Sequence, residues 1–211
     1  MKIVPVPIEY ATDPKARGSF GKFRYAEHHV LSMNGQQTVA EDMIPDSEVK
    51  QGTIYLPERI IGNLGGLATE LAKGADQNGI YTGRKVVVNN CARFIHDLIG
   101  IEFDTKMLEN HNLYGDWLTE LKSNPNDEPG TVPTADPLYV PKVGEVAIYK
   151  HRSSPAWSHW AMGIDGDLQG VIGLGGPNGH GLSIAASNDV AKSLGFNIPQ
   201  SATHPQYSHL Q

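Results

Sequence analysis

The chain has little cysteine, no excess of basic charge and no long apolar run, and each shortage excludes a class of protein. Its single cysteine among 211 residues cannot form an intrachain disulfide or a paired-cysteine metal site. Lys and Arg number 17 against 23 Asp and Glu, for a net charge of −6, so we expect no nucleic-acid partner. No apolar run is long enough to cross a bilayer, so we expect no membrane span.

The remaining composition is that of a folded globular chain. Apolar residues make up 39% and charged residues 19%, which argues against a disordered, self-repelling polypeptide. A chain of this length forms one domain, or one domain with an extension. We predict an N-terminal extension at residues 1–75 packed on a core at residues 76–200, and a loose C-terminal tail at residues 201–211.

The first 75 residues contain a hairpin signal and one helical pattern. Asn34-Gly35 lies between partly apolar flanks, which is typical of a tight β-turn. A helix is predicted over residues 57–73, because Pro57 suits a first helical position and apolar residues then recur at three- and four-residue steps. Gly74 is a plausible end for this helix.

A second helix is predicted to begin near Cys91. Phe94, Ile95, Leu98 and Ile99 form one helical face, and Gly100 suits the C-terminal end. Asn89 or Asn90 would cap its start, which places Cys91 in the first turn. We also predict a helix over residues 105–122.

Residues 1–56 are predicted to be irregular with short strands, and three further strands are predicted after an extended loop. Prolines at 125, 129, 133, 137 and 141 forbid a helix and indicate an extended loop. Residues 144–150, 158–164 and 170–174 then alternate or run apolar, which predicts an antiparallel meander of three strands with a turn at Asp165-Gly166-Asp167.

Cys91 is a candidate nucleophile. A thiol at a helix N-terminus lies near the positive end of the helix dipole and near unpaired backbone N–H groups, and both favour the reactive thiolate. The same N–H groups can bind the oxyanion of a tetrahedral intermediate. The alternative is a small buried side chain with no chemical role, since free cysteine is among the most buried residue types.

His159 is the candidate base, and its orienting partner is left open. It lies at the start of an apolar strand, at a strand edge and not in mid-core, and a cysteine nucleophile needs such a base within hydrogen-bond reach. The alternative is a structural histidine with no chemical role. Asn178 or His180, in the glycine-rich segment after the third strand, could orient the ring of His159. The other histidines form no HExxH motif or ligand cluster, so we expect no metal and no cofactor.

Three segments together resemble the NlpC/P60 and CHAP cysteine peptidases. In that family a cysteine opens a helix, a Gly-Asp strand follows, and a histidine begins the next strand. Tyr81, ten residues before the cysteine, is similar to the tyrosine that precedes the nucleophile in NlpC/P60 sites. The matching segments are Val88–Ile95, with Cys91, then Val143–Tyr149, with Gly-Glu in place of Gly-Asp, and Ser158–Ile164, with His159.

The resemblance implies a fold, an activity and a biological setting. The fold would be α+β and papain-like, with the nucleophile helix packed on an antiparallel sheet and an N-terminal extension. The activity would be cleavage of amide bonds in peptidoglycan stem peptides by Cys91, His159 and Asn178 or His180, with Tyr81 and Asn90 at the substrate or oxyanion.

A small enzyme of this kind resembles an antibacterial type VI secretion effector or a phage lysis enzyme. We expect synthesis in the cytoplasm without a signal peptide, export or injection into the periplasm of a target cell, and an immunity protein as a possible partner.

Two other interpretations stay open. The same catalytic residues could serve a thiol-dependent deamidase or acyltransferase that acts on a protein or a lipid. A non-catalytic binding module is the third possibility, in which Cys91 belongs to the core and the proline-rich segment at residues 125–141 is a docking surface. Activity on peptidoglycan separates the first two, and thiol reactivity separates both from the third.

Overall fold

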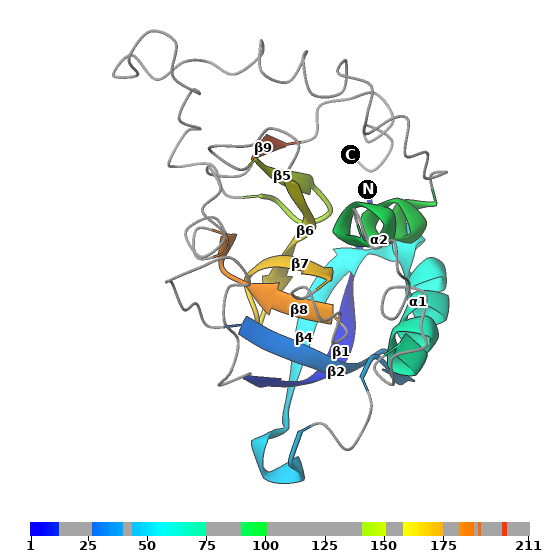
Figure 1. Cartoon of the computed structure of the whole chain (residues 1–211), viewed down its shortest axis with the longest axis vertical. Helices are drawn as coiled ribbons and strands as arrows, with labels where there is room; N and C mark the ends of the chain where they lie inside the picture. Colours follow the sequence, from blue (N-terminus) through cyan, green and yellow to red (C-terminus); the bar gives the residue numbers. More distant parts are fainter. Residues whose placement is uncertain are drawn as a thin grey trace, which may run out of the picture.

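The computed structural model describes residues 1–12, 27–39, 44–74, 90–100, 141–150, 158–174, 182–187, 190 and 200–201. Strands predominate among these residues, and two α-helices lie beside each other at one side of the sheet (Figure 1). The strands are β1 (Ile3–Thr12), β2 (Glu27–Met33), β3 (Gln36–Gln37), β4 (Lys50–Pro57), β5 (Val146–Lys150), β6 (Ser158–Gly166), β7 (Gly170–Leu174), β8 (Leu182–Ala185) and β9 (Gln200–Ser201). The helices are the short 3-10 turns η2 (Asp46–Glu48) and η3 (Glu58–Ile60), and α1 (Ile61–Gly74) and α2 (Asn90–Ile99).

Six of the strands form a closed antiparallel barrel. Their order is β4-β1-β2-β8-β7-β6, and a further pairing between β4 and β6 closes the ring. β5 and β9 continue the sheet outward from β6, and β3 pairs with β2. β4 and β5 share one edge of β6, because β5 pairs with its first half and β4 with its last two residues.

The expected α+β fold of the papain-like, NlpC/P60 type is wrong. α2 does pack on the sheet, but the sheet is not an open layer, because strands from the first 60 residues pair with β8 and β6 of the second half and close it into a barrel. These pairings join residues far apart in the sequence, and no local pattern indicates them. The division into residues 1–75, 76–200 and 201–211 stays a prediction, although β1, β2 and β4 are barrel strands.

The predicted hairpin and meander are confirmed. Asn34 and Gly35 connect β2 to β3 with φ angles of 51° and 76°, the left-handed conformation that an Asn-Gly turn favours. β5, β6 and β7 are consecutive antiparallel strands. The predicted turn at Asp165–Asp167 is wrong for its first two residues, because they pair with Tyr55 and Ile54 and extend β6.

Both helices that begin in described residues are confirmed, with a shift at the first. Pro57 is extended, with ψ 127°, and precedes η3 instead of being the first helical residue. α2 begins at Asn90 and is followed by Gly100, whose φ of 76° is the left-handed end that the sequence predicted. The predicted helix over residues 105–122 and the proline-rich segment at residues 125–141 lie, but for Pro141, outside the described residues.

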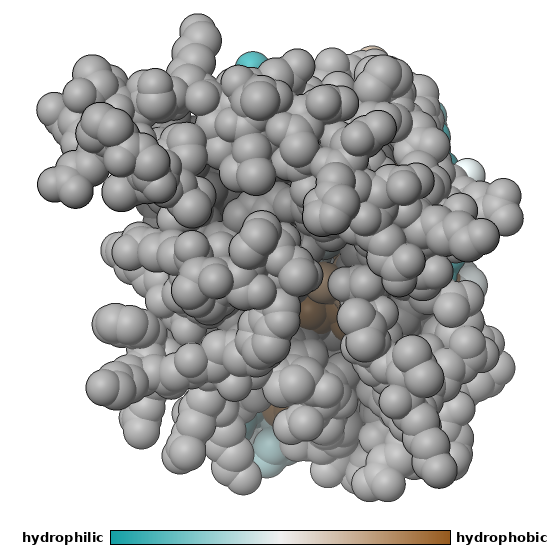
Figure 2. All heavy atoms as spheres, turned by 45° about the horizontal axis from the view of Figure 1, so that its top comes forward, coloured by the Kyte–Doolittle hydropathy of each residue, from teal (hydrophilic) through white to brown (hydrophobic). Residues whose placement is uncertain are grey.

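The main core fills the barrel and extends under the helices. Alternate residues of β6, namely Trp160, Met162 and Ile164, belong to it, as do Phe94 and Ile95 of α2. A smaller cluster holds Ala147, Ala161, Val171 and Ala185, each next to a main-core residue on its strand, together with Val190, which lies outside the strands. Figure 2, which brings the top of Figure 1 forward, shows described apolar residues in a recess near its centre and in a smaller area below it.

Candidate functional site

Cys91 lies where the sequence predicted, in the first turn of α2. It is the second residue of the helix, and its side chain is half-buried against the main core. The apolar face of the helix holds it there, since Phe94 and Ile95 are completely buried and Leu98 nearly so. The thiol therefore lies at the positive end of the helix dipole, and the later turns of the helix are packed in the core. A position at the positive end of a helix favours the thiolate form of a cysteine.

α2 packs on β6, the strand that carries His159. The rings of His96 on α2 and Trp160 on β6 lie 5.3 Å apart, tilted by 47°. Both side chains are only 2% exposed, so they form part of the interface between helix and sheet. α2 is also tied to α1, because Asn63 Nδ2 donates a hydrogen bond of 3.1 Å to the carbonyl oxygen of Leu98.

His159 is the second residue of β6 and pairs with Tyr149 of β5. Its side chain lies outside the described set, so the predicted Cys91–His159 distance of about 3–5 Å stays a prediction. The next residue, Trp160, faces α2 and the core.

The other predicted site residues are not placed by the structure. Tyr81, Asn178 and His180 lie outside the described residues. Asn90 is the first residue of α2, directly before Cys91, so its backbone lies within the helix, and the predicted cap by Asn89 or Asn90 stays a prediction. The structure thus brings together the elements that carry Cys91 and His159, and it leaves the third residue open.

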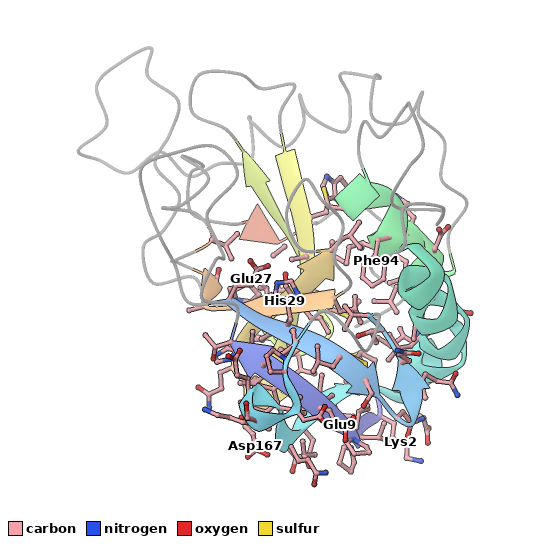
Figure 3. All side chains as sticks on the ribbon, turned by 60° about the horizontal axis from the view of Figure 1, so that its bottom comes forward. Lys2, Glu9, Glu27, His29, Phe94 and Asp167 are labelled. Carbon is pink, nitrogen blue, oxygen red and sulfur yellow. The ribbon has the colours of Figure 1, made fainter. Side chains whose placement is uncertain are left out.

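The sequence reasoning missed three buried polar residues on two paired strands. Glu27 and His29 of β2 are 6% and 7% exposed, and Ser183 of β8 lies directly opposite His29 with 9% exposure. Figure 3 shows Glu27 and His29 as neighbours at one end of β2. Glu27, His28 and His29 are three consecutive polar residues, and nothing in the sequence distinguishes the two that are buried, because that depends on the pairing of β2 with β8.

His28 points away from His29, as expected for adjacent residues of a strand. Its ring packs edge-on against Tyr10, with centroids 5.5 Å apart, and its Nδ1 lies 3.3 Å from the Thr12 hydroxyl. Partial burial, and then the positive charge of Lys50, lower the pKa of His28 below its ordinary value. These surroundings favour the neutral form of His28, and the contacts of its ring with Tyr10 and Thr12 are to β1.

Among the described residues, no group of three or more His, Cys, Asp or Glu side chains is arranged to hold a metal ion. None of the helices in the same part of the chain is both long enough and apolar enough to cross a membrane.

Comparison with protein-family models, curated proteins and solved structures finds no match for this chain. The resemblance to NlpC/P60 and CHAP peptidases stays a prediction that rests on the three sequence segments.

An open groove among the described residues lies away from Cys91. It is lined by residues of β1, β2, β3 and β4 and of the segment 44–49 between β3 and β4. None of its described lining residues belongs to α2 or β6. The groove is therefore not a substrate cleft for a nucleophile at Cys91.

Proposed function

We propose that the protein is a cysteine-dependent hydrolase that cleaves amide bonds in peptidoglycan stem peptides. The observation that carries the proposal is the half-buried thiol of Cys91 in the first turn of a helix that packs on the strand of His159. The substrate class comes from the sequence resemblance. The family's fold is no part of this proposal, because a helix-borne cysteine and a strand-borne histidine can meet on other scaffolds.

In the proposed reaction, His159 takes the proton of Cys91 and the thiolate attacks the carbonyl carbon of the amide. Backbone N–H groups at the start of α2, with Asn90 and Tyr81 near them, stabilise the negative oxygen that forms. The protonated His159 then gives its proton to the leaving amine, and the C–N bond breaks. Water, activated by His159, hydrolyses the thioester and restores the thiol. Asn178 or His180 orients the histidine.

The test is a muropeptide assay on purified peptidoglycan with four proteins. These are the wild type, Cys91→Ala, His159→Ala and the double variant, each checked by thermal melting. We expect each single change to lower the cleavage rate by on the order of 10³-fold or more, and the double variant to be no worse, because nucleophile and base act as one unit. Full activity in Cys91→Ala would contradict the proposal.

A second measurement tests the thiol without reference to substrate. Iodoacetamide at pH 6 should alkylate Cys91 faster than an unperturbed thiol with pKa about 8.5, and His159→Ala should slow the reaction. A reactive thiol without peptidoglycan cleavage would indicate the deamidase or acyltransferase. A thiol that reacts no faster than a free one would indicate the non-catalytic binding module.

We further propose that the enzyme acts on other bacteria, as an effector or a lysis enzyme that reaches the periplasm of the target cell. An immunity protein would then protect the producing cell by covering Cys91. Directing the wild type to the periplasm of a Gram-negative host should lyse the cells, whereas Cys91→Ala directed there should not. Equal toxicity of the two proteins would contradict this setting.

A further inference from the structure

The groove on the outer face of β1, β2 and β4 has a volume of about 1210 Å³. Figure 3 shows Glu9, which lines it, well away from Phe94 of α2. The groove is thus a separate feature from the site around Cys91, and the proposed hydrolase chemistry makes no use of it.

The floor of the groove is a continuous row of polar side chains. The strand register places Gln37 of β3 opposite Ser32 of β2, Ser32 opposite Glu9 of β1, and Glu9 opposite Gln51 of β4. Residues directly opposite each other on antiparallel strands lie on one face, with Cβ atoms roughly 5 Å apart. All four residues line the groove. An amide, a hydroxyl, a carboxylate and a second amide therefore follow one another across four strands.

Glu9 is the charged centre of this row. Its carboxylate is half-buried and accepts a hydrogen bond of 2.9 Å from the Ser32 hydroxyl. The register between β1 and β2 shifts directly after it, and such a bulge re-aims the side chains on either side. One donor leaves most of the acceptor positions of a carboxylate unused. Within the described residues no cation pairs with Glu9.

The rest of the lining adds negative charge and apolar surface. Asp46 of η2 lines the groove, and none of the described lining residues is Lys, Arg or His. Val39, Ile44 and Val49 contribute apolar side chains from the chain that runs between β3 and β4. A carboxylate between two amides and next to apolar surface suits a cation at the end of an alkyl chain. The methylene groups of such a ligand can pack on the apolar surface while its charged group pairs with the carboxylate.

We propose that this groove binds an alkylammonium or guanidinium group, with Glu9 as its ionic partner and Gln37 and Gln51 as hydrogen-bond partners beside it. A lysine or arginine side chain of a bound polypeptide has this chemistry, and so does a free polyamine. The net charge of −6 adds a general attraction for such ligands.

The proposal is tested by titrating the whole chain with three probes. These are a short peptide with one central lysine, the same peptide with that lysine acetylated, and spermidine. The wild type should bind the lysine peptide or spermidine and not the acetylated peptide. Tighter binding of spermidine would assign the cation to a free polyamine, and tighter binding of the peptide would assign it to a polypeptide.

Two variants and one control locate the binding. Glu9→Gln keeps an acceptor for Ser32 and removes the charge, and it should weaken binding at least about tenfold. Glu58→Gln removes an equal charge at an exposed carboxylate outside the groove and should leave binding unchanged. Gln51→Lys, at an exposed position opposite Glu9, supplies a competing ammonium and should block the site even if Glu9→Gln does not fold.

Binding of no probe, equal binding of the acetylated peptide, or undiminished binding by both groove variants would overturn the proposal.

Discussion

The two edges of β4 are joined to the barrel in very different ways. One edge pairs with β1 over eight residue pairs, from Ile3↔Pro57 to Tyr10↔Lys50. The other edge pairs with β6 over only two, Ile54↔Gly166 and Tyr55↔Asp165. We call these the long joint and the closing joint. β4 is thus paired with β1 along its whole length and with β6 at only two of its residues.

The closing joint is extended by contacts beyond its two pairs. Asp167 Oδ2 accepts a hydrogen bond of 2.7 Å from the backbone N–H of Thr53, and the Asp167 N–H donates one of 2.9 Å to the Thr53 carbonyl. Gly166 has a φ of 115°, and a Cβ there would lie 2.4 Å from the same Thr53 carbonyl oxygen. A residue without a side chain is therefore required for the two strands to approach.

The long joint is held by its eight residue pairs and not by a few side-chain contacts. The first residue after β4, Glu58, donates its backbone N–H to the Lys2 carbonyl, and the side chains of the two residues form an exposed ion pair. An exposed pair of this kind contributes little, because water and salt screen it. We therefore expect single changes at the ends of the long joint to matter less than single changes at the closing joint.

The largest effect should follow from Gly166→Ala. The added methyl group meets backbone atoms, and the positive φ is strained for any L side chain, so we expect a loss of roughly 2–4 kcal/mol in the free energy of unfolding. Urea denaturation measures it. Gly62→Ala in α1 is the control, since a Cβ there meets nothing within 4 Å and alanine favours a helix by up to about 1 kcal/mol. A Gly166→Ala protein as stable as the wild type would show that β4 and β6 are not held together here.

A smaller effect is expected from Asp167→Ala. It removes the side-chain acceptor for the Thr53 N–H, and we expect a loss of about 1–2 kcal/mol, typical of a charge-assisted hydrogen bond near the surface. Lys2→Ala removes the ion pair at the end of the long joint and should change stability by less than about 0.5 kcal/mol. If thermal melting found Lys2→Ala the more damaging of the two, the two joints would not differ as proposed.

The smallest effect concerns pH at the far end of the long joint, where Tyr10 pairs with Lys50 and packs on His28. The pKa of His28 is lowered in the folded state, so the unfolded chain binds more protons as the pH falls through about 6.5. This contribution to stability is complete at pH 7.5 and is lost as the pH falls towards the folded pKa.

His28→Gln should therefore reduce the fall in melting temperature between pH 7.5 and pH 5. Lys50→Met removes only the second cause of the shift and should reduce the fall by less. Equal pH dependence in the wild type and His28→Gln would contradict the assignment.

The part of the candidate site that could be predicted is the part set by local sequence. Apolar spacing from Phe94 to Ile99 and the glycine at position 100 placed α2, and with it Cys91 at the helix start. The contact between His96 and Trp160 could not be predicted, because it depends on which strand the helix covers. The same holds for the pairing of His29 with Ser183, which joins opposite halves of the chain.

The sequence by itself determined the Asn34-Gly35 hairpin, both helices in the described residues and the meander of β5, β6 and β7. These elements follow from turn residues and apolar periodicity within a few positions of one another. Only the tertiary structure decided that the sheet closes. Thr53 and Asp167 are 114 residues apart, and their contact depends on the twist and register of six strands, a property that no short stretch of residues encodes.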